Sequence, residues 1–245
     1  MLRGVYLSNA ENDEFLSFSN PQLDRKIGGL PVPTMTLIEG TNDSGKSVLS
    51  QQIVYGAVKD GNKVLLVTTE SSPQKIIENM LSLSWDVGMS FILGKLKIVQ
   101  IDALNVKWNP ESSNYLLITL LNYMRRNIEN YNLIIIDSLS TFLSNSDNKD
   151  ILNFFSSCKE LIDRHKVSYV ITIHSYAVNS EVFRRIRDIC DGHLLMEKKT
   201  FRERTVLTIN IIKLKGANLK SSEMISFETS EVQGIKILPF TSTRG

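Results

Sequence analysis

Residues 38–49 constrain this chain more than any other part of its sequence. From Gly40 to Ser47 they read Gly-Thr-Asn-Asp-Ser-Gly-Lys-Ser and match G-x-x-x-x-G-K-[S/T], the phosphate-binding loop of nucleoside triphosphatases. A β-prone run at 34–38 enters the loop, and 48–58 leaves it with the apolar spacing of a helix. The sequence therefore predicts a strand, a loop and a helix that together bind a nucleotide.

Each part of this loop suits a phosphate chain. Its glycines let the backbone approach an anion closely, and the helix start directs unpaired N–H groups and the positive dipole end towards it. Lys46 can reach the β- and γ-phosphates, and the Ser47 hydroxyl can bind Mg²⁺. A chance glycine-rich turn is the alternative, which the matching flanks disfavour. The predicted nucleotide contacts are Asn42, Asp43, Ser44, Gly45, Lys46, Ser47 and Val48.

The chain is expected to form one folded domain. Its 245 residues suffice for a large α/β domain, and no Pro/Gly/Ser-rich linker or internal repeat divides it. We expect residues 1–19 to be an irregular lead-in and residues 20–245 to form a single domain. The net charge of +2 does not call for nucleic acid, and the basic stretch 184–187 has no interleaved aromatic residues, so it reads as a solvated helix face.

Cysteine usage and hydropathy favour a cytoplasmic protein. Cys158 and Cys190 lie far apart in helix-like stretches, which suits reduced, buried thiols better than a disulfide framework or a metal site. No apolar run approaches the roughly 18 residues of a membrane span. Residues 1–14 are too acidic for a signal peptide. We therefore expect any link to a membrane to run through a partner.

Strands and helices alternate along most of the sequence. The predicted strands are 34–38, 64–69, 96–101, 133–136 and 167–174. The predicted helices are 48–58, one that begins at Ser72-Pro73 with Ser72 as its cap, one capped by Ser112 or Ser113 that ends at 129, 147–166 and 180–190. From Gly192 onwards strands follow one another, at 194–198, 206–215, 224–227 and 235–238. This order predicts an α/β fold, a mainly parallel sheet flanked by helices and extended by antiparallel C-terminal strands.

Two acidic residues end strands that should lie beside the loop. Asp137 follows the apolar run 133–136, the position at which P-loop proteins hold Mg²⁺ directly or through water. Because Ser138 comes next, no glutamate adjoins Asp137 to activate an attacking water. Glu70 is the remaining candidate base, since the carboxyl ends of parallel strands share one edge. The structural alternatives are a turn at Asp137 and a helix-dipole contact for Glu70.

His174 and two lysines complete the candidate residues. His174 ends the predicted strand 167–174, where it could hydrogen-bond the γ-phosphate or the attacking water, or simply be satisfied by backbone. Lys213 and Lys215 alternate along a strand, so both side chains leave from one face. They could reach the nucleotide of a neighbouring subunit, or they could protect a solvated strand edge.

Six segments carry a family resemblance, namely 24–29, 40–49, 68–70, 135–140, 172–174 and 234–239. Together they resemble the KaiC-like branch of the RecA superfamily of P-loop ATPases, and more closely the nucleotide-binding proteins of the archaellum, the archaeal motility motor. The resemblance spans nearly the whole chain from about Asn20. It implies a RecA-like fold, ATP with Mg²⁺, and a homo-hexameric ring with nucleotide at the subunit interfaces. It also implies a cytoplasmic position beneath the membrane, with the archaellum motor ATPase and a ring-forming scaffold component as partners.

Two departures from the family pattern predict weak hydrolysis. Active KaiC-like domains often carry paired acids after the second strand, whereas Ser71 follows Glu70 here. They also carry a Lys-x-Arg finger that acts across the interface, whereas Lys213 and Lys215 stand in that pattern. Lysine cannot form the two-pronged contact of arginine to phosphate oxygens, and an arginine finger can supply about 10³–10⁵ in rate. We therefore expect a regulatory switch that binds ATP and turns it over slowly.

Two other activities remain open. A RecA-type DNA-dependent ATPase, such as a recombinase or helicase motor, is disfavoured by the near-neutral charge and by the lack of an evident basic and aromatic groove. A KaiC-like autokinase would phosphorylate serines or threonines near Glu70.

Overall fold

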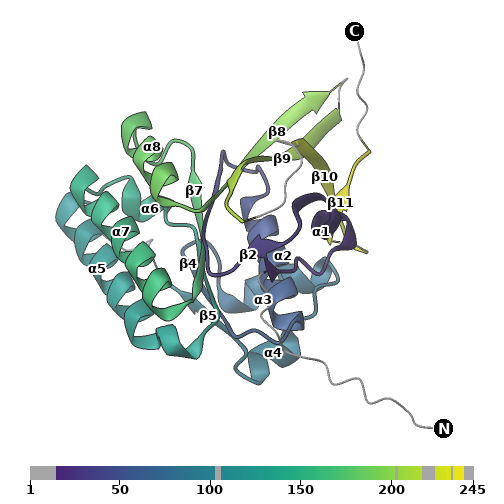
Figure 1. Cartoon of the computed structure of the whole chain (residues 1–245), viewed down its shortest axis with the longest axis horizontal. Coiled ribbons are helices and arrows are strands. Elements are labelled where there is room, and N and C mark those ends of the chain that lie inside the picture. The colour runs from purple at the N-terminus through teal and green to yellow at the C-terminus, as the bar shows by residue number, and fades with distance from the viewer. Residues whose placement is uncertain (1–14, 103–105, 202–203, 217–223, 233, 240–245) are drawn as a thin grey trace.

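The computed structural model describes residues 15–102, 106–201, 204–216, 224–232 and 234–239, and a nine-stranded sheet runs through them (Figure 1). Its strand order is β11-β10-β9-β8-β3-β7-β6-β4-β5. The parallel strands are β3 (Met35–Gly40), β4 (Val64–Thr68), β5 (Leu96–Gln100), β6 (Leu133–Asp137), β7 (Ser168–His174) and β8 (Gly192–Phe201). The antiparallel strands are β9 (Arg204–Leu214), β10 (Met224–Ser230) and β11 (Gly234–Ile237). The predicted fold class is confirmed.

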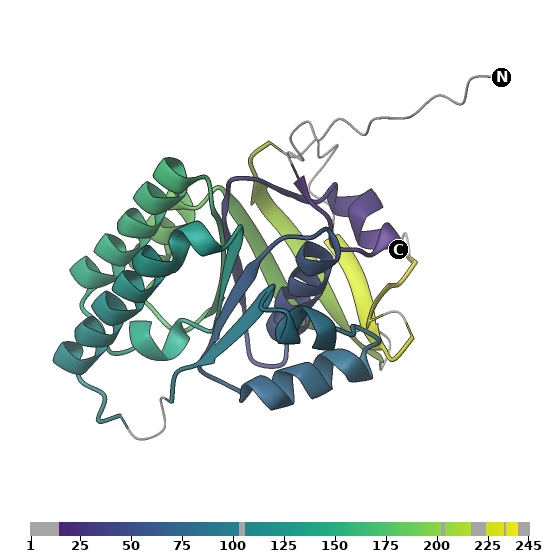
Figure 2. The same cartoon turned by 90° about the horizontal axis from the view of Figure 1, so that it is seen from below.

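Helices cover both faces of this sheet (Figures 1 and 2). On one face lie α1 (Pro21–Ile27), α2 (Lys46–Lys59), α3 (Pro73–Ser82) and α4 (Gly88–Ile92). On the other lie α5 (Pro110–Asn127), α6 (Ser140–Leu143), α7 (Asn148–His165) and α8 (Ser180–Ile189). A separate apolar cluster fills the space on each side, so strands such as β4 and β6 are buried along their whole length. Two-sided burial explains why these strands read as continuous apolar runs.

Helix starts show where local sequence signals succeeded and failed. Ser72 caps α3 as predicted, because its hydroxyl accepts a hydrogen bond from the Lys75 N–H. The predicted cap of α5 at Ser112 or Ser113 is wrong. Asn109 caps that helix instead, and Ser112 completes a capping box by bonding back to the Asn109 N–H.

The packed part of the chain begins before Asn20. Residues Phe15–Leu16 form β1, which pairs with β2 (Leu30–Pro31), and Phe18 is 1% exposed. Helix α2 holds this segment, since the Gln52 side chain donates to the Phe18 carbonyl at 2.6 Å. The expected irregular lead-in therefore ends earlier than residue 19, and its residues 1–14 lie outside the described part of the chain.

Both cysteines are buried free thiols, and burial raises the pKa of Cys190 to about 12. Thiols with such high pKa values are poor nucleophiles at neutral pH, so Cys190 acts here as a packing residue. Over the ranges that the structure describes, none of the helices combines the length and the apolar character that a membrane crossing needs.

A buried charge cluster fixes the strand that enters the phosphate loop. Glu39, just before Gly40, is 3% exposed, and the Arg187 guanidinium of α8 contacts both of its carboxylate oxygens at 2.7 Å. His193 of β8 lies 2.8 Å from the same carboxylate. Burial raises the pKa of Glu39, but the hydrogen bonds with His193 and Arg187 outweigh it and lower the pKa overall. One member of the basic stretch 184–187 therefore has a structural role that the sequence did not indicate.

We expect Arg187→Met to lower the free energy of unfolding by about 1–3 kcal/mol, because it leaves a buried carboxylate with one partner fewer. Arg185→Met on the same helix is the matched control. Arg185 forms an exposed pair with Glu181 at 2.9 Å, so its loss should change the free energy by less than about 0.5 kcal/mol. Urea unfolding at pH 7 measures both values. Equal effects of the two substitutions would contradict the structural role of Arg187.

Candidate nucleotide-binding site

The predicted phosphate loop lies at the carboxyl end of β3, in the middle of the sheet. Gly45, the loop residue just before helix α2, has a left-handed backbone with φ +89°, which glycine adopts without strain. Helix α2 starts at the next residue, Lys46, and Gly45 offers no side chain to cap it. The first N–H groups of α2 consequently face the loop, in the arrangement that binds anions in P-loop proteins.

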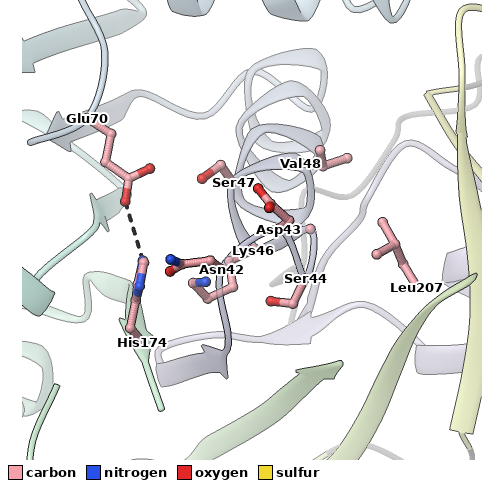
Figure 3. A pocket seen from close by; sticks show the side chains of 10 residues that line it. Asn42, Asp43, Ser44, Lys46, Ser47, Val48, Glu70, His174 and Leu207 are labelled. Carbon is pink, nitrogen blue, oxygen red and sulfur yellow. Dashed lines mark ion pairs between the residues drawn. The ribbon is translucent and has the colours of Figure 1, made fainter. Parts of the chain in front are cut away.

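A cavity of about 610 Å³ opens over this loop. Its lining contains all the predicted loop contacts and both predicted catalytic residues, namely Asn42, Asp43, Ser44, Gly45, Lys46, Ser47, Val48, Glu70 and His174, together with Leu207. In Figure 3, Glu70 and His174 lie at one end of the cavity, whereas Val48 and Leu207 lie at the other. The site therefore has a polar end and an apolar end, with the phosphate loop between them.

Lys46 is held inside the loop. Its side chain is mostly buried, and its ammonium donates a hydrogen bond to the Thr41 carbonyl at 2.6 Å. Burial lowers the pKa of Lys46, although the carboxylates of Glu70, Asp137 and Asp43 act in the opposite direction. An anion seated in the loop would favour the charged form of this lysine, which is the role predicted for it.

Asp137 is the last residue of β6 and is 7% exposed. Three hydroxyl groups donate to its carboxylate, Thr172 at 2.7 Å, Ser50 at 3.0 Å and Ser47 at 3.3 Å. Burial raises the pKa of Asp137, and these hydroxyl donors only partly offset that effect. A cation placed beside the carboxylate would stabilise its charged form.

The two predicted metal ligands fit a magnesium ion. The Ser47 hydroxyl and the Asp137 carboxylate are hard oxygen donors, and their nearest oxygen atoms lie 3.3 Å apart. Neighbouring ligands of an octahedral Mg²⁺, each about 2.1 Å from the metal, lie about 3 Å apart. These two residues lie close together because strands β3, β4, β6 and β7 end at the same edge of the sheet, and their role as metal ligands stays a prediction.

Glu70 and His174 lie at the same edge of the sheet, and their side chains face each other. The Nε2 atom of His174 lies 3.6 Å from the Glu70 carboxylate, and the backbone N–H of His174 donates to the Ser140 hydroxyl at 2.8 Å. Burial and the nearby Lys46 lower the pKa of His174, while Glu70 acts to raise it. The neutral form of the imidazole is therefore favoured. The geometry leaves the catalytic roles of both residues as predictions.

Lys213 and Lys215 do not line the cavity of their own chain. The Lys213 ammonium donates to the Cys190 carbonyl at 2.5 Å and to the Arg187 carbonyl at 3.2 Å, so it caps the end of α8. Lys215 is largely exposed and lies 3.6 Å from Asp191. Only Lys213 lies on β9, which ends at Leu214, whereas Lys215 is in the turn that follows. Their contact with the nucleotide of a neighbouring subunit stays a prediction.

The sequence analysis missed four residues that contact this site. Ser50 and Thr172 donate to Asp137, Tyr176 contacts His174 and Asn42, and Leu207 lines the cavity. For two of these residues, the spacing in the sequence could have indicated their place in the site. Ser50 lies one helical turn after Ser47, and Thr172 lies two residues before His174 on a strand, so each shares a face with a predicted residue. Leu207 reaches the cavity from β9, a strand distant in sequence, and a single sequence gives no sign of that contact.

Fold and site together define a P-loop nucleotide-binding protein with a RecA-like sheet. The sequence model of the KaiC ATPase family matches residues 19–242. An archaeal flagellar ATP-binding protein FlaH from Sulfolobus acidocaldarius is 32% identical over 229 residues, which cover 94% of this chain and 99% of that protein. This chain therefore belongs to the KaiC ATPase family and, within it, to the FlaH proteins.

More distant relatives agree with this assignment. The circadian clock oscillator protein KaiC from a Picosynechococcus species is 29% identical over 89% of this chain, but the match covers 43% of KaiC. The crystal structure of the flagellar accessory protein FlaH from Methanocaldococcus jannaschii superposes with a TM-score of 0.80. That match is 23% identical and covers 93% of this chain and 99% of the other, so it supports the fold alone.

We expect Thr172→Val to weaken Mg²⁺-dependent ATP binding about tenfold, because the Asp137 carboxylate loses its shortest hydrogen bond and its orientation. Calorimetric titration with ATP, in Mg²⁺ and in EDTA, separates the metal-dependent part. Thr208→Val is the matched control, since Thr208 is a buried threonine whose hydroxyl bonds to the Glu197 carbonyl on β8. A loss of affinity that is equal in Mg²⁺ and in EDTA would contradict the proposed link to the metal.

Proposed function

We propose that this chain is the ATP-binding regulatory and assembly component of an archaellum motor. The observation that carries the proposal is the pairing of two buried charges at one sheet edge, Lys46 within the phosphate loop and Asp137 against Ser47. A nucleoside triphosphate supplies negative charge beside Lys46, and Mg²⁺ supplies positive charge beside Asp137. Membership among the FlaH proteins, which are named archaeal flagellar ATP-binding proteins, supports ATP and the archaellum.

Slow hydrolysis is part of this proposal. The proposed base Glu70 lies 3.6 Å from His174 and has no second acid next to it in sequence. Lys213 and Lys215 stand where related ATPases often carry an arginine finger, and Lys213 is engaged by carbonyl groups of its own chain. The absence of an arginine there would forgo about 10³–10⁵ in rate. With such slow turnover, ATP acts mainly as a bound ligand, and the protein is either in an ATP-loaded state or in an empty state.

We further propose that the chain forms a homo-hexameric ring with nucleotide at the subunit interfaces. In this arrangement, Lys213 and Lys215 of one subunit approach the cavity of the next. ATP binding favours the ring and raises its affinity for the archaellum motor ATPase and for a ring-forming scaffold component, at the cytoplasmic side of the membrane. Such a switch requires the partners to bind the ATP-loaded and empty states with different affinities.

Pull-down of the archaellum motor ATPase, with and without MgATP, tests this function. We expect wild-type protein to retain at least about tenfold more motor ATPase when ATP is present, a difference of about 1.4 kcal/mol in binding free energy. Lys46→Ala should remove the response because the loop loses its phosphate contact. Lys59→Ala, at the exposed end of the same helix, is the matched control and should respond as wild type does.

Three outcomes would contradict the proposal in different ways. Equal retention of the motor ATPase in both states would refute the switch. ATP turnover that DNA stimulates and Lys46→Ala abolishes would favour a RecA-type motor instead. A mass gain of one phosphate after incubation with ATP would show autokinase activity and refute a purely ligand-like role of ATP.

A further inference from the structure

Tyr176 joins three polar side chains that line the nucleotide cavity, those of Asn42, His174 and Glu70. Asn42 is on the phosphate loop, and its side-chain oxygen accepts a hydrogen bond from the Tyr176 hydroxyl at 2.7 Å. The Tyr176 oxygen lies 2.6 Å from Nδ1 of His174. The other ring nitrogen of His174, Nε2, faces the Glu70 carboxylate at 3.6 Å. The phosphate loop is thereby connected to both candidate catalytic residues through Tyr176.

The hydrogen-bond directions among these side chains determine where His174 carries its proton. A tyrosine hydroxyl has a single proton, and the Tyr176 proton is donated to Asn42. The Tyr176 oxygen must therefore accept from Nδ1 of His174, which then carries the imidazole proton. In the neutral ring, the second nitrogen, Nε2, is left with a lone pair. This atom consequently accepts a hydrogen bond and does not donate one.

We propose that Tyr176 is a positioning residue: held by Asn42, it fixes His174 in the Nδ1–H form and presents Nε2 as an acceptor beside Glu70. The tautomer itself does not depend on the proposed function, but its consequence for ATP turnover does. Phosphate oxygens of ATP accept hydrogen bonds, whereas water can donate them. Nε2 in this form is therefore matched to the attacking water and not to the γ-phosphate, and Glu70 and His174 act together on that water.

The positioning role of Tyr176 can be tested by a substitution that leaves the fold undisturbed, because the side chain is largely exposed. Tyr176 is 64% exposed, and its ring meets that of His174 edge to face, with centroids 5.2 Å apart. Phenylalanine keeps this ring contact and removes the hydroxyl alone. The charged groups that face the His174 ring are Lys46 and Glu70, and neither is altered by this substitution.

Long-range ¹H–¹⁵N correlation spectra of the ¹⁵N-labelled full chain, without nucleotide and at a pH where His174 is neutral, report the tautomer directly. The chain has three histidines, and His193 provides an internal reference because its Nε2 must donate to the Glu39 carboxylate. We expect His174 to show a protonated Nδ1 and an unprotonated Nε2, whereas Nε2 of His193 should be protonated. Tyr176→Phe should shift His174 towards the Nε2–H form.

A second variant, which changes Asn42 and keeps the Tyr176 hydroxyl, should also favour the Nε2–H form of His174. Asn42→Ala leaves the Tyr176 hydroxyl without its acceptor, so that hydroxyl can donate to Nδ1 and move the imidazole proton to Nε2. Tyr115→Phe, which alters an exposed tyrosine on α5, is the control and should leave His174 unchanged. An Nε2–H form in the wild type, or an Nδ1–H form retained in both site variants, would overturn the inference. Because these spectra need no nucleotide, such a result would leave ATP binding, tested separately with Lys46→Ala, unaffected.

Discussion

Two buried charges of opposite sign, Lys46 and Asp137, determine what this site can bind. Burial lowers the pKa of the lysine and raises that of the aspartate, so each charged form is disfavoured by the surrounding protein. The lysine rests on the Thr41 carbonyl, and hydroxyl groups hold the aspartate. In the proposed complex, a triphosphate with Mg²⁺ would supply the opposite charge beside each of them. Ligand binding and the stability of the site are therefore linked through the same two residues.

The sheet explains how these charges meet. Lys46 follows β3, Asp137 ends β6, Glu70 follows β4 and His174 ends β7, and all four strands are parallel neighbours in one sheet. The cluster of Glu39, Arg187 and His193 then fixes β3 against α8 and β8. Lys213 caps that same helix, so the residue proposed to reach a neighbouring subunit is connected through α8 to the strand that carries the phosphate loop.

Much of the fold was predictable because the signals are local. Continuous apolar runs predicted the buried parallel strands, the loop motif predicted the start of α2, and strand ends placed Asp137, Glu70 and His174 at one edge. The contacts that escaped prediction depend on packing between distant segments. Arg187 lies 148 residues from Glu39, and Tyr176 lies 134 residues from Asn42. A charged or aromatic residue on a surface helix or loop gives no sequence signal for such partners.

A crystal structure of the full chain with Mg²⁺ and a non-hydrolysable ATP analogue tests the central claim most directly. The account predicts that the β- and γ-phosphates contact Lys46 and that the metal lies between the Ser47 hydroxyl and the Asp137 carboxylate, directly or through one water. An analogue bound away from the phosphate loop, or a metal that contacts neither Ser47 nor Asp137, would contradict it.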